Sequence, residues 1–382
     1  MTLTVLQIIP ALGSGGAEQG TVDIAAALVK RGDRALIVTE GGWREETALN
    51  AGANVILHDA ATKNPVQIIK NAFWLADLIR REKVDIVHAR SRAPAWSAKL
   101  ACKMTGRPFV TTFHAAYKIS GAAKRLYNSV MASASRVIAV SPFISTHIRE
   151  NYGVPDRRLR VIDRGLDLSA LDPAVITEDR LSVLRTAWKL QEGQKPIILP
   201  ARLSAIKGHD TVLLALGKLK RRGVTLPPVV FVGDDQGRAR YSRKLYDLVA
   251  HQGLDGIVTF AGACSDMPAA YALAQLVLQP SRVPEGFGRV PVEAMAMGVP
   301  VIASDLGAMK DTILEGQTGW LVAPEHPDEW AKAIERALSM KPEQRETMAC
   351  TARGHVAAHY ANEIMVAKTL AVYDELAAER KQ

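Results

Sequence analysis

The chain has 382 residues, of which 48% are hydrophobic and 23% are charged, as is typical of a globular protein with two domains. Its three widely spaced cysteines argue against a disulfide framework and a cysteine metal site, and they point to a reducing compartment. The chain starts without a basic leader, and no apolar run reaches the roughly eighteen residues of a membrane-spanning helix. We therefore expect a cytoplasmic protein.

The net charge of +9 lies entirely in the first part of the chain. Residues 1–170 hold 23 Lys and Arg against 14 Asp and Glu, whereas residues 171–382 hold 25 of each kind. A basic half favours an anionic partner, which is a membrane surface, an acidic substrate or nucleic acid. Aromatic residues make up only 5% of the chain and do not interleave with the basic ones, which argues against nucleic acid.

Apolar strand segments alternate with helical segments in both halves, which predicts an α/β fold with parallel sheets. The first half predicts strands near 3–9, 35–39, 54–57, 84–88, 109–113, 136–140 and 159–162, and helices near 17–31, 65–82, 92–105, 121–133 and 142–151. The second half predicts strands near 196–201, 229–233, 257–261, 275–279 and 299–303, and helices near 208–221, 239–252 and 266–272.

The polar segment 163–195 interrupts this alternation and is predicted to be a domain junction. We expect a first domain over residues 1–170 and a second over 171–359. The tail from 342 to 382 is predicted to be nearly all helix, and its last part, 360–382, is assigned to a helix that returns to the first domain. Two such doubly wound domains are expected to face each other across a cleft between the carboxyl ends of their strands.

The stretch 280–304 organises the second domain. Glu285 stands in a loop after an apolar strand, Gly286 and Gly288 follow it, and Glu293 lies on the helix that begins there. Glycines at a helix start bring bare backbone N–H groups to an anion. Carboxylates beside an anion site would repel the anion unless they bind another group. Sugar and ribose hydroxyls are suitable groups, because a carboxylate accepts hydrogen bonds from them.

Other polar residues also follow apolar strands, where ligands of α/β sheets bind. Arg202 and Lys207 are suited to a diphosphate. Gly13, Gly15 and Gly16 form either a phosphate nest or a plain turn, and Glu18 stands where a dinucleotide fingerprint needs glycine. His114, His88 and Arg90 are further candidates because they also lie where apolar strands end. The segment 163–167 follows the last strand of the first half, and it either lines the cleft or makes a hinge turn.

Two adjacent acids, Asp234 and Asp235, follow the strand near 229–233. A metal pair is conceivable there, but no third acid or histidine is close in sequence, so a solvated turn is the better interpretation.

Together these residues resemble the retaining glycosyltransferases of family 4, which have the GT-B fold. The resemblance rests mainly on Glu285-Gly-Phe-Gly followed by Glu293, a Glu-x7-Glu motif, and on Gly-Gly-Ala-Glu at 15–18, Arg-Leu-Ser-x-x-Lys-Gly at 202–208 and Ala-Val-Ser at 139–141. The segment from His88 to Pro94 resembles transferases of lipopolysaccharide core assembly. Two departures are Arg164, where the family often has Asn, and Gly233-Asp234-Asp235, where it often has a Gly-x-Gly turn.

The resemblance implies roles for the matching residues. Arg202 and Lys207 would bind the donor diphosphate, Glu293 the ribose, and Glu285 with the amides of Phe287 and Gly288 the donor sugar. Gly286 would belong to the part of the donor site formed by Glu285, Phe287 and Gly288. Gly15 and Gly16 would approach the donor phosphates, and the segment 260–263, which includes Gly262, would lie by the base. His114 would contact the donor sugar. No metal and no cofactor are expected, because the basic pair takes the metal's place.

The sequence therefore predicts transfer of a sugar from a nucleotide-diphosphate donor to an acceptor hydroxyl, with retention by front-side attack. The expected acceptor is a lipid-linked or anionic glycan, such as a lipopolysaccharide core, at the inner membrane face. The segment 118–136 is either an interfacial helix or a helix packed on its own sheet, with Lys124, Arg125, Leu126, Tyr127, Val130 and Met131 as the residues that suggest it.

Other functions agree less well with these residues. A nucleotide-sugar epimerase or another GT-B enzyme acting on a soluble acceptor shares the fold, whereas a sugar phosphorylase would need a cofactor lysine site that the sequence lacks. A non-catalytic binding module has no reason to keep Arg202, Lys207, Glu285 and Glu293 together. An NAD-dependent dehydrogenase is disfavoured by the defective glycine fingerprint.

Overall fold

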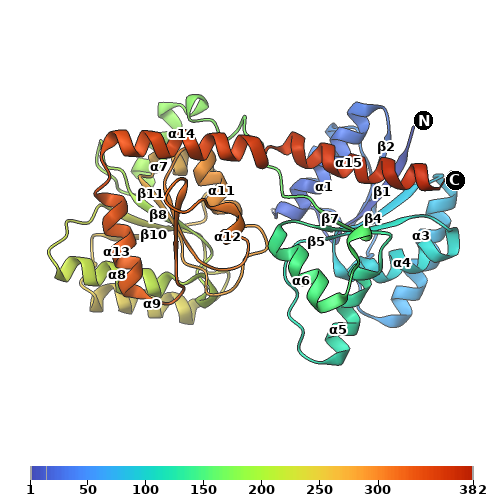
Figure 1. Cartoon of the computed structure of the whole chain (residues 1–382), viewed down its shortest axis with the longest axis horizontal. Coiled ribbons are helices and arrows are strands. Elements are labelled where there is room, and N and C mark those ends of the chain that lie inside the picture. The colour runs from blue at the N-terminus through green and yellow to red at the C-terminus, as the bar shows by residue number, and fades with distance from the viewer. Residues whose placement is uncertain (1, 14, 381–382) are drawn as a thin grey trace. The chain divides into compact units, whose positions relative to one another are not determined.

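The computed structural model describes residues 2–13 and 15–380, which fold into two compact units. Unit 1 comprises the chain up to Gly165 and the chain from Asn362 onward, and unit 2 comprises Leu166–Ala361 (Figure 1). The domain limits proposed from the sequence, residues 170 and 359, fall a few residues inside unit 2. No helix of the described residues is long and apolar enough to cross a bilayer.

Unit 1 is built on a parallel sheet of order β3-β2-β1-β4-β5-β6-β7. Its strands are β1 (Thr4–Ile8), β2 (Arg34–Thr39), β3 (Asn54–Leu57), β4 (Ile86–Ala89), β5 (Phe109–Phe113), β6 (Arg136–Ala139) and β7 (Leu159–Val161). Its helices are α1 (Gly16–Arg31), α2 (Glu45–Asn50), α3 (Pro65–Arg81), α4 (Arg92–Thr105), α5 (Ala122–Ser129), α6 (Pro142–Tyr152) and α15 (Asn362–Glu379), with short 3₁₀ turns at Val130–Ser133 and Asp156–Arg158.

Unit 2 is also built on a parallel sheet, whose strand order is β10-β9-β8-β11-β12-β13. Its strands are β8 (Ile197–Pro200), β9 (Val229–Val232), β10 (Val258–Gly262), β11 (Leu276–Gln279), β12 (Val301–Ser304) and β13 (Gly319–Val322). Its helices are α7 (Glu178–Ala187), α8 (His209–Arg221), α9 (Ala239–His251), α10 (Met267–Leu273), α11 (Arg289–Ala296), α12 (Met309–Thr312), α13 (Pro327–Leu338) and α14 (Pro342–His359), with 3₁₀ turns at Pro173–Val175 and Ala205–Lys207.

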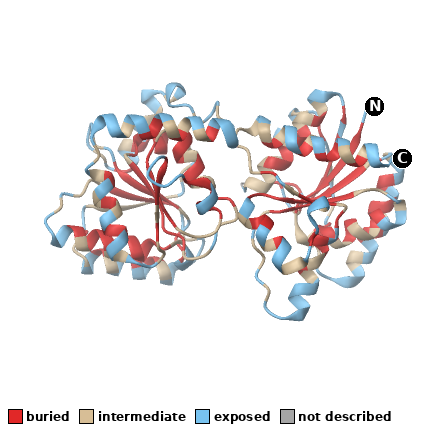
Figure 2. Ribbon diagram, in the orientation of Figure 1, coloured by how far each residue is buried: buried red, intermediate tan, exposed pale blue. Residues whose placement is uncertain are grey.

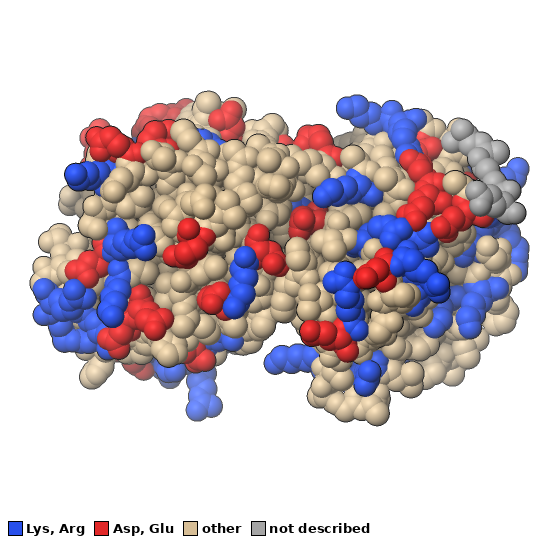
Figure 3. Space-filling view, in the orientation of Figure 1, with Lys and Arg blue, Asp and Glu red and all other residues tan. Residues whose placement is uncertain are grey.

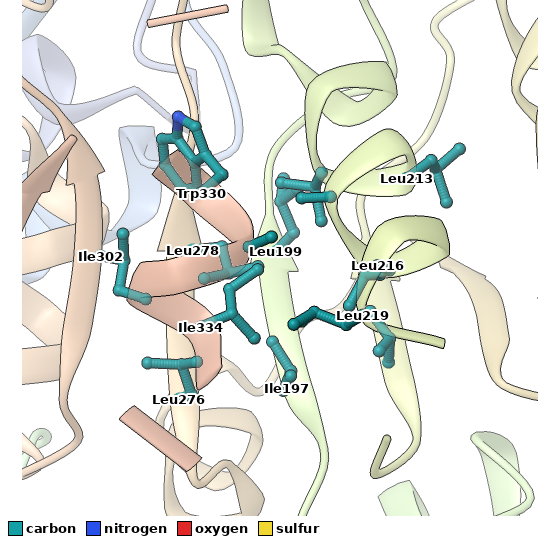
Figure 4. Close-up of a cluster of buried hydrophobic side chains, with 14 of the residues drawn as sticks. Ile197, Leu199, Leu213, Leu216, Leu219, Leu276, Leu278, Ile302, Trp330 and Ile334 are labelled. Carbon is teal, nitrogen blue, oxygen red and sulfur yellow. The ribbon is translucent and has the colours of Figure 1, made fainter. Parts of the chain in front are cut away.

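Both sheets are doubly wound, as the alternation of segments predicts. The strand order reverses after β1 in unit 1 and after β8 in unit 2, which places a topological switch point at the carboxyl ends of these strands. The strands are mostly continuous apolar runs because helices cover both faces of a parallel sheet (Figures 1 and 2). The unit 2 core includes Leu199, Leu278 and Trp330, which point into the space between β-strands and helices α8 and α13 (Figure 4).

Several elements differ from the sequence prediction. The polar segment 163–195 contains the helix α7, in which only Leu184 is buried, so hydrophobic periodicity gave no signal for it. The predicted helix near 121–133 is α5 followed by a 3₁₀ turn. The helices α2 and α13 and the strand β13 were not predicted. The helical tail is confirmed over the described residues, as α14 and α15.

Helix α15 is fastened to the sheet of unit 1 by charged and polar contacts. Glu375 accepts hydrogen bonds from Arg136 at 2.8 Å and Arg160 at 2.5 Å. The Tyr373 hydroxyl lies 2.7 Å from Nδ1 of the buried His88. The two arginines lower the pKa of Glu375, with the hydrogen bond from Arg136 as the largest cause.

Replacing Glu375 with glutamine is expected to lower the melting temperature at neutral pH by about 2–4 °C. A carboxyl whose pKa is lowered in the folded state stabilises that state above its unfolded pKa and loses this effect as the pH falls. The difference between variant and wild type should therefore shrink below about pH 4. Thermal melts over a pH series measure it, with Glu363→Gln, on the same helix but without an ion pair among the described residues, as control. An unchanged difference at acid pH would contradict the ionic origin.

Candidate functional site

Glu285 lies in the loop between β11 and α11, and its carboxylate is held by donors from two loops. Its Oε1 accepts hydrogen bonds from Lys207 Nζ at 2.5 Å, Ser281 Oγ at 2.7 Å and Gln279 Nε2 at 3.2 Å. All three contacts converge on one oxygen. Oε2 has no partner among the described residues, so this oxygen remains available to accept a hydrogen bond from a ligand.

The loops after β8 and β11 lie together because their backbones meet. Arg282 N–H donates to the Ile206 carbonyl at 2.8 Å. Gly208 has a φ of 71°, and a Cβ at this position would lie 1.9 Å from the Pro280 oxygen. Only glycine permits this approach, and the approach brings Lys207 within reach of Glu285 although 78 positions separate them.

Arg202 is the second residue after β8 and differs from Lys207 in its surroundings. It is exposed, and it has no hydrogen bond or ion pair with another described residue. A guanidinium and an ammonium carried by the loop that follows one buried strand are suited to an anion. The sequence predicted both residues for the same ligand, and the structure places both at the same edge of the unit 2 sheet.

Glu293 is the second acid of the motif and lies on α11. Its Oε2 accepts a hydrogen bond from the Tyr271 hydroxyl at 2.8 Å, and its Oε1 accepts two from Arg289, at 2.8 Å from Nη2 and 3.1 Å from Nε. Burial, followed by the charge of Glu293, raises the pKa of Tyr271 well above its ordinary value, so the phenol stays protonated and donates. Because a carboxylate oxygen can accept two hydrogen bonds and Oε2 accepts only that of Tyr271, Glu293 retains capacity for a ligand hydroxyl at Oε2.

The residues between the two acids form the start of α11. Gly288 is the N-cap with a φ of 85°, and no side chain caps the helix, so its first N–H groups are available to an anion. A Cβ on Gly288 would lie 1.9 Å from the Met309 methyl. The Phe287 ring is buried and lies 5.5 Å from the Tyr360 ring, so only the backbone of Phe287 is offered to a ligand. Gly286 precedes it in the same loop.

A pocket of about 450 Å³ opens at the carboxyl ends of β9 and β10, and we call it the β9–β10 pocket. It is lined by Leu203, Asp234, Arg243, Tyr246, Phe260 and Gly262, together with Gly233, Asp235, Ala239 and Ser242. Asp235 accepts hydrogen bonds from Gly237 N–H and the Ser242 hydroxyl at 2.9 and 3.0 Å, which agrees with the predicted turn. The described residues contain no group of three or more potential metal-binding side chains.

His114 follows β5 in unit 1 and contacts Arg164. Arg164 Nη2 lies 2.8 Å from His114 Nδ1. A guanidinium can only donate, so Nδ1 must accept and the proton must lie on Nε2. Burial, followed by the charge of Arg164, holds the pKa of His114 well below its ordinary value. His114 is therefore a neutral donor, and its buried Nε2 has no partner among the described residues.

The other predicted residues of unit 1 are His88, Arg90 and the glycines before α1. His88 is fully buried between Tyr373 and Thr112, at 2.7 and 2.8 Å, so it is a satisfied core histidine. Arg90 is buried, and a Cβ on Gly20 would lie 3.0 Å from its Nη2. Gly15 is the N-cap of α1, which begins at Gly16, and Ser14 between Gly13 and Gly15 lies outside the described residues.

The predicted interfacial segment 118–136 does not form one helix. Lys124, Arg125 and Leu126 are exposed on α5, whereas Val130 and Met131 are fully buried. Of the apolar and aromatic residues named for this segment, only Leu126 is exposed, and Tyr127 is half-buried.

Comparisons with known proteins support the family suggested by these motifs. The model for glycosyl transferases group 1 matches residues 183–355, and the model for glycosyltransferase family 4 matches residues 14–170. A solved glycosyltransferase from Rickettsia africae is 33% identical, covers 98% of each chain, and superposes with a TM-score of 0.90.

The chain belongs to the group 1, family 4 glycosyltransferases. Its two parallel-sheet units are the Rossmann-like domains of the GT-B fold, as predicted. The structure of Anabaena Alr3699/HepE in complex with UDP-glucose is 24% identical over 97% of this chain and all of that one, with a TM-score of 0.80. A D-inositol 3-phosphate glycosyltransferase of Gordonia bronchialis is 28% identical over 78% of this chain, which spans 64% of that relative.

Sequence reasoning missed three residues that hold the predicted ones in place. Arg289 lies four positions before Glu293 on a helix, a spacing that signals an ion pair. Tyr271 and Ser281 gave no such signal. Tyr271 comes from a different helix, and Ser281 reads as an ordinary loop residue until the position of Glu285 is known.

Proposed function

We propose that this glycosyltransferase moves a sugar from a nucleotide-diphosphate sugar to an acceptor hydroxyl and retains the configuration at the transferred carbon. The observation that carries the proposal is the cluster of unit 2 in which Lys207 contacts Glu285 beside the free Arg202. Cations for a diphosphate and carboxylates for hydroxyls match the two chemical parts of such a donor. Retention is supported by the resemblance to family 4.

The proposed reaction breaks the bond between the sugar carbon and the diphosphate oxygen and forms a bond from that carbon to the acceptor oxygen. The acceptor proton passes to the departing diphosphate. Arg202 and Lys207 stabilise the negative charge that grows on the diphosphate, so most of the barrier reduction is electrostatic and positional. We propose that these two cations make a metal ion unnecessary, and unchanged turnover in excess chelator is the expected result.

His114 is proposed to donate its Nε2–H to a substrate hydroxyl. The support is the buried Nε2 without a partner among the described residues, together with the contact from Arg164 that fixes the tautomer. Gly15 and Gly16 at the start of α1 and the amides of Gly286, Phe287 and Gly288 at the start of α11 are proposed to approach the donor through their backbones.

A thermal-shift panel of nucleotide sugars tests the donor class, because a ligand that binds only the folded state raises the melting temperature. At least one nucleotide sugar is expected to raise it, and release of a nucleoside diphosphate should then depend on an acceptor. If no nucleotide sugar stabilises the protein, the proposed function is wrong.

The acceptor is proposed to be lipid-linked, such as a lipopolysaccharide core, and to be met by unit 1 at an anionic membrane surface. Unit 1 holds 26 Lys and Arg against 17 Asp and Glu, whereas unit 2 holds 22 of each. In the view of Figure 3, basic and acidic side chains are interspersed on unit 1, so the excess is not gathered in one patch of that face.

The surface best suited to a bilayer is the outer face of α3. Val66, Ile69 and Phe73 are 62%, 52% and 64% exposed and share one helix face by their spacing. Lys63 and Lys70 are exposed nearby and have no ion pair with another described residue. Apolar side chains flanked by lysines match the acyl boundary and the anionic headgroups of a lipid surface.

The double variant Ile69→Ser/Phe73→Ser is expected to bind anionic vesicles at least tenfold more weakly than wild type, because each lost side chain contributes about 1.5–3 kcal/mol on burial. Co-sedimentation with vesicles containing phosphatidylglycerol, at low and high salt, measures it. Leu126→Ser on α5 and Val183→Ser on α7, both at exposed apolar positions, are the controls and should bind normally. Equal binding of the double variant would refute the α3 surface, and salt-independent binding would refute the electrostatic part.

A further inference from the structure

The β9–β10 pocket adjoins the residues proposed to bind the diphosphate. Leu203 lines the pocket and directly follows Arg202. Its N–H donates to the Asp234 carbonyl at 2.8 Å, which fixes the loop after β8 to the loop after β9. A nucleotide whose diphosphate lies on Arg202 and Lys207 therefore has this pocket beside its phosphates. The following inference rests on the proposed function in this respect.

The pocket offers aromatic surface for a flat ring. Tyr246 on α9 is half exposed, and its ring centroid lies 4.4 Å from that of Phe260 on β10. Gly262 lines the same pocket, and a Cβ there would meet nothing within 4 Å, so the space beside the β10 end is open. A volume of about 450 Å³ accommodates a purine.

Two side chains of opposite charge line the pocket without being paired. Asp234 and Arg243 are both exposed, and neither has an ion pair or a side-chain hydrogen bond with another described residue. The neighbouring acid is not available in the same way, because the Asp235 carboxylate already accepts hydrogen bonds from Gly237 N–H and the Ser242 hydroxyl. The pocket therefore presents one free anion and one free cation to a base.

This pair distinguishes the nucleobases by their hydrogen-bonding edges. Guanine presents two adjacent donors, N1–H and N2–H₂, which suit the two oxygens of a carboxylate, and its O6 and N7 acceptors suit an arginine. Adenine places an acceptor next to its amino group, so a carboxylate meets only one donor. Uracil has a single N–H between two carbonyl oxygens, and a carboxylate against that edge faces acceptors on both sides.

We propose that the β9–β10 pocket selects guanine, so that the donor is a guanosine-diphosphate sugar, with Asp234 binding N1–H and N2–H₂ and Arg243 binding the O6/N7 edge. This departs from the nucleotide in the Alr3699/HepE structures, which contain UDP.

Titration calorimetry with GDP, UDP and ADP tests the proposal in the full-length protein. GDP is expected to bind at least tenfold more tightly than UDP or ADP, which is the discrimination typical of one good bidentate contact. Asp234→Asn and Arg243→Met should each weaken GDP binding about tenfold or more and leave UDP binding nearly unchanged. Asp247→Asn and Arg240→Met, which change exposed charges of α9 that do not line the pocket, should leave the preference intact.

The possible outcomes separate this proposal from the proposed function. Tighter binding of UDP or ADP, or a GDP preference that survives Asp234→Asn and Arg243→Met together, would overturn the guanine assignment while the transfer from a nucleotide sugar stands. Failure of all three diphosphates to bind would overturn the guanine assignment, whereas failure of every nucleotide sugar in the thermal-shift panel would overturn the proposed function itself.

Discussion

Replacing Lys207 with alanine is expected to lower turnover by roughly a hundredfold or more, by analogy with the loss of one donor that stabilises transition-state charge. The substitution removes one of the two cations at the end of β8. It also removes the ammonium that lies 2.5 Å from Glu285, whose Oε1 would then depend on Ser281 and Gln279 alone. Turnover at saturating donor and acceptor measures the effect.

Lys218→Ala is the matched control for this substitution. Lys218 lies on α8 of the same unit and forms an exposed ion pair with Asp328, so its loss should leave turnover near that of wild type. Near wild-type turnover of Lys207→Ala would show that the diphosphate is bound elsewhere. Retention of part of the activity by Lys207→Arg would support a charge requirement at this position.

The sequence predicted most strands and helices of both units because a parallel sheet leaves a strong pattern. Strands such as β8 and β9 are continuous apolar runs, and the polar residues that follow them include candidate residues. The missed elements lack that pattern. The strand β13 begins at a glycine and has only four residues, and α7 buries a single leucine, so neither shows the periodicity on which prediction depends.

The candidate site could be predicted as a list of residues but not as a set of contacts. Lys207 and Glu285 were assigned to different parts of the donor, and no sequence pattern pairs residues that lie on separate loops. The sequence does not decide whether Arg164 lines a cleft or belongs to a hinge turn. Its contact with His114 becomes apparent only when the ends of β5 and β7 are placed in one sheet. Long-range pairings of this kind depend on the strand order, which the sequence does not state.

Replacing Glu285 with glutamine is expected to lower turnover roughly ten- to hundredfold, the range that corresponds to one lost hydrogen bond with a charged group. The amide can still accept from Ser281 and Lys207 through its oxygen. Its nitrogen, however, can only donate, so the position held by Oε2 no longer accepts from a sugar hydroxyl. Steady-state kinetics measure the loss, and Glu325→Gln, at an exposed acid of the same unit, is the control.

The double variant Lys207→Ala/Glu285→Gln distinguishes a coupled pair from two independent binding residues. If each residue served only its own part of the donor, the two losses in turnover would multiply. Because Lys207 donates directly to Glu285, removal of either residue also disturbs the other, and the combined loss should be clearly smaller than the product. Multiplicative losses would show that the 2.5 Å contact is not maintained during turnover, and that the diphosphate separates Lys207 from Glu285 when the donor binds.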